Sequence, residues 1–73
     1  MDEEHYELLK NFFRRWSTLE ITPESRMLLR EDVMHVRVLL EVDEADTSML
    51  EGVEKAQSRD FFAKKYQELT TRK

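Results

Sequence analysis

The sequence contains no cysteine and only one glycine and one proline among 73 residues. Without cysteine, the chain can form neither disulfides nor thiolate metal sites. The two histidines, His5 and His35, are far apart and outside any ligand spacing, so we expect no structural metal and no cofactor. A domain of this size must then gain its stability from tight helix packing or from a second subunit.

Long apolar runs are also absent, because the longest such run spans two or three residues. This pattern excludes a transmembrane span and a signal peptide, and it predicts a soluble, cytoplasmic protein. Residues 1–73 are enough for a single small domain. Since one glycine and one proline leave few turn signals for β-hairpins, we expect an all-α fold.

Catalytic motifs are missing as well. There is no cysteine nucleophile, no serine in a nucleophile elbow, and a single glycine cannot form a phosphate-binding loop. Carboxylate pairs arise by chance in a chain with 38% charged residues and carry no weight for acid–base catalysis. We therefore predict that the protein is not an enzyme.

Four segments show helical signals. In the second, Thr22 is a natural N-cap and Pro23 occupies the first helical position. In the third, Ser48 and Glu51 match a capping box. Apolar residues change sides near Ser58, which indicates a break before the last segment. The expected fold is a small bundle of three to four helices, at about 3–18, 23–42, 47–57 and 59–71.

The first helix is expected to bury a wide apolar face. At about 100° per residue, its aromatic and leucine side chains share one arc, whereas Lys10 and Arg14 lie opposite. Phe61 and Phe62 place further aromatics in the last helix, so the simplest packing joins the terminal helices in aromatic clusters on either side of helix two. The apolar arc comprises Tyr6, Leu8, Leu9, Phe12, Phe13, Trp16 and Leu19.

Within helix two, residues 33–42 also alternate between apolar and polar side chains in the manner of a β-strand. A lone strand needs a pairing partner, and this one could find it only across a dimer. The strong helix start and the long run without glycine or proline favour a helix.

As a helix, the second segment is apolar on two sides. The broad stripe comprises Leu28, Leu29, Val33, Val36, Leu39 and Leu40, and the second stripe comprises Met27, Met34, Val38 and Val42. Arg26, Arg30 and Arg37 line one gap between the stripes, and Glu31, Asp32 and His35 fall in or near the other. A helix of this kind is either central in the bundle or part of a dimer interface, which makes the second stripe the candidate partner surface.

Charge is distributed unevenly along the chain. Residues 1–54 carry 14 acidic and 6 basic side chains, a net charge of −8, whereas residues 55–73 carry 6 basic and 2 acidic ones, a net charge of +4. The basic end supplies a possible contact for phosphates through Lys64, Lys65, Arg72 and Lys73. Residues 41–54 contain six acids and no base, which could imitate a phosphate backbone.

Two functional hypotheses follow. The first is a non-enzymatic helical module for protein–protein interaction (an adaptor, assembly factor or inhibitor) that forms a homodimer through helix two. The alternative is a regulator of nucleic-acid transactions, either an acidic mimic that inhibits a nucleic-acid-binding protein or a weak binder through the basic C-terminal helix. Membrane-surface binding by residues 3–19 is disfavoured because the polar face of that helix is mixed in charge.

Overall fold

The computed structural model describes residues 2–40 and 44–71, and this part of the chain is built from helices without a strand. The predicted all-α fold is therefore confirmed. In chain order the elements are α1 (Glu3–Ser17), α2 (Pro23–Leu39), α3 (Glu44–Thr47), the 3₁₀ turns η1 (Ser48–Leu50) and η2 (Val53–Lys55), and α4 (Arg59–Thr71).

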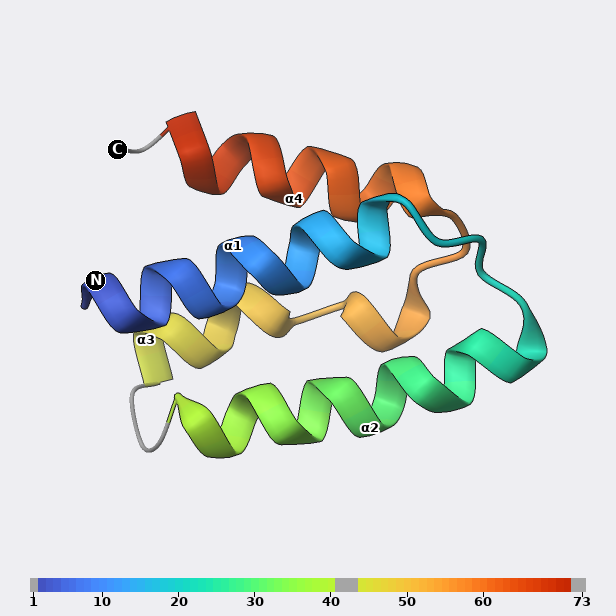
Figure 1. The fold of residues 1–73 in the computed structure, drawn as a ribbon, viewed down its shortest axis with the longest axis horizontal. Coiled ribbons are helices and arrows are strands. Elements are labelled where there is room, and N and C mark those ends of the chain that lie inside the picture. Colours follow the sequence, from blue (N-terminus) through green and yellow to red (C-terminus); the bar gives the residue numbers. More distant parts are fainter. Residues whose placement is uncertain (1, 41–43, 72–73) are drawn as a thin grey trace.

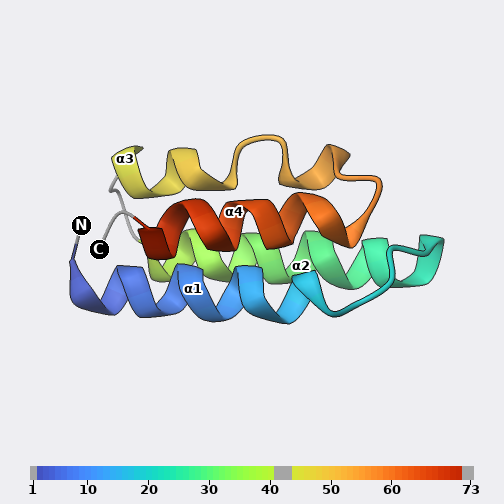
Figure 2. The same cartoon turned by 90° about the horizontal axis from the view of Figure 1, so that it is seen from above.

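The elements form an up-down-up-down bundle. Figure 1 shows α4 and α2 at opposite edges, with α1 between them. The view from above (Figure 2) places α1 on one side of the bundle and the α3–η1–η2 segment on the other. The short helix and the two turns thus occupy the position that a third long helix takes in a four-helix bundle.

Side chains cap the starts of α1 and α2. The Asp2 carboxylate accepts a hydrogen bond from the Glu4 backbone N–H at 3.0 Å. The Thr22 hydroxyl accepts one from the Ser25 N–H at 3.1 Å, and the Ser25 hydroxyl accepts one from the Thr22 N–H at 2.7 Å. These reciprocal bonds form a capping box, with Pro23 in the first turn as predicted.

Helix α2 is helical from residue 33 to Leu39, so the strand alternative for this stretch is wrong for the residues that the structure describes. The Leu40 N–H still donates to the Val36 carbonyl at 2.9 Å and closes the last turn. The predicted end at 42 lies outside the described residues, as does Val42.

The third segment differs from the single helix predicted for residues 47–57. Gly52 adopts φ of 79°, a left-handed conformation that interrupts the helix and separates the two 3₁₀ turns. Ser48 is not a helix cap with Glu51; its hydroxyl instead donates to the Ala45 carbonyl at 2.6 Å. This broken path still turns the expected apolar side chains inward, and the structure buries Met49, Leu50, Val53 and Ala56.

The predicted break before the last helix is confirmed, because residues 56–58 are not helical and α4 begins at Arg59. The Ser58 carbonyl accepts a hydrogen bond from the Phe61 N–H at 3.3 Å.

The aromatic core joins α1 directly to α4. The Phe62 ring is fully buried, and its centroid lies 6.2 Å from the centroids of both Phe12 and Trp16. On the water face of α1, Lys10 donates to Glu7 at 3.1 Å, and this hydrogen bond raises the pKa of Lys10. The prediction that the terminal helices share an aromatic cluster is therefore confirmed. Helix α2 lies at an edge of the bundle and not between them (Figure 1).

Candidate interaction surface

Three apolar side chains of α2 point away from the bundle. The exposed fraction is 69% for Met27, 65% for Met34 and 74% for Val38. At about 100° per residue, these positions fall within about 40° of one another around the helix axis. We call these three residues the outer face of α2. They belong to the second stripe that the sequence identified.

The opposite side of α2 belongs to the core. Leu29, Val33, Val36 and Leu40 are buried, and they face α1 and the third segment. Since the outer face lies about 180° from these residues, none of the described elements covers it. The folded domain therefore presents a stripe of large apolar side chains to solvent.

The core stripe of α2 is narrower than the sequence predicts. Leu28 is 61% exposed and Leu39 is 45% exposed, although both share the predicted broad stripe with Leu29. Leu19, predicted in the buried arc of the first helix, lies beyond the end of α1 and is 40% exposed. These three leucines extend the exposed apolar surface on one flank of the outer face. The sequence pattern alone does not distinguish these leucines from buried ones, because the width of the buried side depends on how many neighbours cover the helix.

Charged side chains border the outer face and are sorted by sign. Arg30 and Arg37 are exposed at about 60–80° to one side of Met27. Glu24 and Glu31 are exposed at about 40–60° to the other side. The outer face thus has a basic edge and an acidic edge.

A shallow cleft of about 380 Å³ lies beside the acidic edge, between the end of α1 and the first half of α2. Apolar groups of Trp16, Leu19 and Leu28 contribute to its lining. Asp32 forms one wall, because its carboxylate accepts a hydrogen bond from the Trp16 indole N–H at 2.7 Å and lies 3.4 Å from the Arg15 guanidinium. Arg15, Glu31, Asp32 and His35 complete the lining.

Two tethers hold α2 in place. The Arg26 guanidinium donates to the backbone carbonyls of Glu54 at 2.9 Å and Ala56 at 3.0 Å, which ties α2 to the third segment. The bond from Trp16 to Asp32 ties it to α1. Neither tether was expected from the sequence, because long-range partners leave no periodic signal. They make the outer face of α2 a preformed surface.

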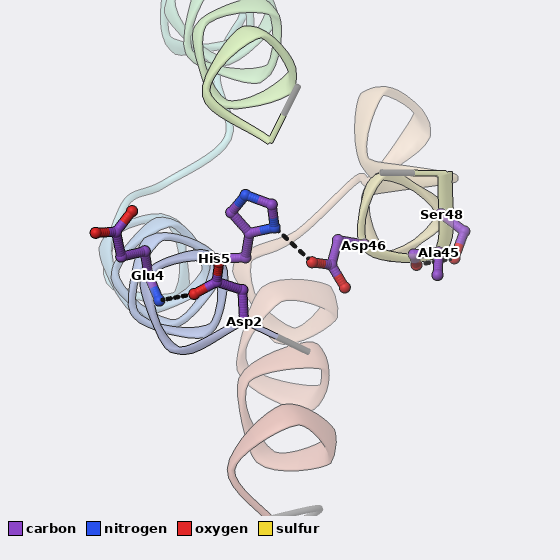
Figure 3. Close-up of polar contacts among 6 residues, drawn as sticks. All are labelled: Asp2, Glu4, His5, Ala45, Asp46 and Ser48. Atoms are coloured by element: carbon purple, nitrogen blue, oxygen red, sulfur yellow. Dashed lines mark hydrogen bonds and ion pairs between the residues drawn. The ribbon is translucent and has the colours of Figure 1, made fainter. Parts of the chain in front are cut away.

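A third polar contact fixes the other side of the bundle. Figure 3 shows the His5 ring of α1 directed at Asp46 of α3, with Nδ1 and the carboxylate oxygen 2.7 Å apart. Both side chains are largely withdrawn from solvent, with 17% and 5% exposed. His5 is thus a partly buried, hydrogen-bonded histidine. Asp46, one of the six acids of residues 41–54, is thereby withdrawn from any exposed acidic surface.

The basic residues proposed as a phosphate contact form no cluster in the described part of the chain. Lys64 is exposed on α4, whereas Lys65 is half-buried with its ammonium 5.8 Å from the centre of the Phe61 ring. Arg72 and Lys73 lie outside the described residues. Helices α4 and α2 lie at opposite edges of the bundle (Figure 1).

Comparisons with known protein families, curated proteins and solved structures find no match for this chain. Within residues 2–40 and 44–71, no three acidic or histidine side chains are grouped closely enough to hold a metal ion. In the same residues, no helix combines the length and apolarity needed to span a bilayer. The outer face of α2, with its charged edges, is the most distinctive surface of the described residues.

Proposed function

We propose that this protein is a non-enzymatic helical interaction module that forms a two-fold homodimer through the outer face of α2. The observation that carries the proposal is the exposure of Met27, Met34 and Val38 on a helix whose opposite side is fully packed. Large apolar side chains grouped on one face of a soluble domain mark surfaces that bind another protein.

The exposed area is of the size that a dimer needs. Together the six exposed apolar side chains, Leu19, Met27, Leu28, Met34, Val38 and Leu39, present on the order of 600 Å², the upper end for the largest patch on a monomer. A stable interface buries about 800 Å² on each partner. The apolar side chains alone fall below this figure, so the proposed interface also includes the charged edges of the outer face.

A second copy of the chain suits this surface. Small oligomers are most often two-fold symmetric, so that one patch binds the same patch on its partner. The outer face of α2, about 16 Å long from Met27 to Val38, can pack against the same face of a second copy in this way. Methionine side chains adapt their shape to an apolar neighbour, which favours close packing of Met27 and Met34.

Sedimentation velocity with the purified chain and two variants tests the proposal. Val38→Asp places a charge on the outer face, and Gln67→Asp makes a comparable change at an exposed position on α4. We expect dimers for the original chain and for Gln67→Asp, and monomers for Val38→Asp. Circular dichroism should show the same helical content in all three, since neither position contributes to the core.

A monomeric original chain at the highest soluble concentration would refute the homodimer. A Val38→Asp variant that is folded and still dimeric would show that the dimer uses another surface.

The nucleic-acid alternative has less support. Against the acidic version, Asp46 is buried in its contact with His5 and is not part of an exposed acidic surface. Against the basic version, Lys64 is exposed on α4, whereas Lys65 packs near the Phe61 ring, so the two do not form one basic cluster. Titration of a labelled DNA duplex and a labelled single strand at low and moderate salt tests the basic version. Binding that weakens with salt would support the basic version, because phosphate contacts depend strongly on ionic strength.

A further inference from the structure

The charged edges of the outer face bear on the orientation of the two copies. Arg30 lies on one edge, Glu31 lies on the other, and the two positions differ by about 1.5 Å along the helix axis. Arg37 extends the basic edge and Glu24 extends the acidic edge. The apolar side chains of Met27, Met34 and Val38 lie between these edges.

Two-fold symmetry permits only two ways of pairing α2 with its copy. If the two-fold axis is perpendicular to the helices, the helices run antiparallel and edges of the same charge meet. Arg30 and Arg37 of both copies then gather on one side of the contact, and Glu24 and Glu31 gather on the other, in every register. Such like-charge groups oppose association.

If the two-fold axis runs along the helices, the helices are parallel and edges of opposite charge meet. The basic edge of each copy then lies against the acidic edge of the other, and equal residues sit at equal heights. Arg30 of one copy faces Glu31 of its partner, and the same pair forms a second time on the other side of the contact. The apolar residues meet their own copies in the centre: Met27, Met34 and Val38 each pack against the same residue of the second chain.

We propose that the two copies associate with their α2 helices parallel, and that Arg30 and Glu31 select this orientation. The inference rests on the homodimer proposed above and adds its geometry. The apolar stripe supplies most of the attraction, while the charged edges decide between the two arrangements. This division of roles follows from the modest strength of exposed ion pairs and the selectivity that like-charge repulsion adds.

Charge reversal distinguishes the two orientations. In the parallel dimer, Arg30→Glu places a second carboxylate against Glu31 of the other copy on both sides of the contact, and we expect dimer affinity to fall by about tenfold or more. Glu31→Arg should weaken the dimer similarly, because it places a second guanidinium against Arg30. In an antiparallel dimer, Arg30→Glu would instead relieve the cluster of arginines and tighten association.

Two further measurements complete the test. An equal mixture of Arg30→Glu and Glu31→Arg should form a heterodimer, because opposite charges then face each other on both sides of the contact, whereas each variant homodimer has like charges there. The double variant should regain homodimer affinity. Native mass spectrometry identifies the heterodimer because the two variants differ in mass. Sedimentation equilibrium at low salt gives the affinities, and the differences between variants should shrink at about 1 M salt, where charges are screened within a few ångströms.

The outcomes separate the orientation from the homodimer itself. If the original chain dimerises and Arg30→Glu binds as tightly or more tightly, the parallel arrangement is wrong while the homodimer stands. If the single variants weaken dimerisation but the double variant does not recover it, the pairing of Arg30 with Glu31 is wrong. If the original chain is monomeric, both proposals fail together. Thermal unfolding of each variant in its monomeric state shows whether a weakened dimer reflects a damaged fold.

Discussion

Replacing Arg26 by methionine should destabilise the monomer by about 2 kcal/mol. The Arg26 guanidinium donates two hydrogen bonds, at 2.9 and 3.0 Å, to backbone carbonyls of the third segment. Hydrogen bonds from a charged donor contribute about 1.5–3 kcal/mol each, so two buried ones would contribute about 3–6 kcal/mol together. Because this pair is partly exposed to solvent, we expect a smaller sum of about 2 kcal/mol. A domain of 73 residues has a total stability of roughly 4–11 kcal/mol, so this loss is a substantial part of it.

Urea unfolding, followed by tryptophan fluorescence from Trp16 and by circular dichroism, measures the change. With a slope of about 1 kcal/mol per molar urea, the midpoint should fall by about 2 M. Arg26→Lys, which can keep one of the two bonds, should lose about half as much. Arg14→Met is the matched control because Arg14 is exposed on α1. If Arg26→Met and Arg14→Met unfold within about 0.5 kcal/mol of each other, the tether contributes nothing and the reasoning is wrong.

Four further substitutions test the packing, each by urea or thermal unfolding of the monomer. Leu29→Ala should lower the free energy of unfolding by about 2–5 kcal/mol because Leu29 is buried. Leu28→Ala should lower it by less than about 1 kcal/mol because Leu28 is 61% exposed. Equal losses for the two variants would contradict the orientation of α2. Phe62→Ala should cost about 3–5 kcal/mol, and a smaller loss than that of Leu28→Ala would contradict the aromatic core. Gly52→Ala should lower the free energy of unfolding by about 1 kcal/mol, because φ of 79° is unfavourable for alanine. Steric clash does not add to this loss, because the new Cβ would lie 3.7 Å from the nearest atom of Phe61. An unchanged unfolding midpoint would refute the prediction.

Much of the fold was predictable because local signals and burial agreed. Thr22 and Pro23 marked the start of α2, and the change of apolar face near Ser58 marked the break before α4. The aromatic residues of α1 and α4 were expected in the core, and Phe12 and Phe62 are buried there together. Capping and periodicity are properties of neighbouring residues, so a single sequence contains them.

The arrangement of the helices was less predictable because it depends on contacts between distant residues. Leu28 and Leu29 look alike in sequence, and only the position of α2 at the edge of the bundle exposes the first and buries the second. The third segment resembled one helix because its apolar spacing was helical, whereas Gly52 divides it in the fold. The second stripe was identified by its pattern, and the structure exposes Met27, Met34 and Val38 on it.

The absence of cysteine leaves methionine as the only sulfur-containing residue of the chain. Met27 and Met34 are exposed, whereas Met49 is buried. Peroxide converts an accessible thioether into a polar sulfoxide, so among the methionines of the described residues oxidation would begin on the outer face of α2 and spare the core. In the proposed homodimer, each sulfoxide would add an oxygen at a position that packs against an apolar side chain of the second copy. The proposed dimer would then weaken on oxidation of these two methionines, and methionine sulfoxide reductases could reverse the change.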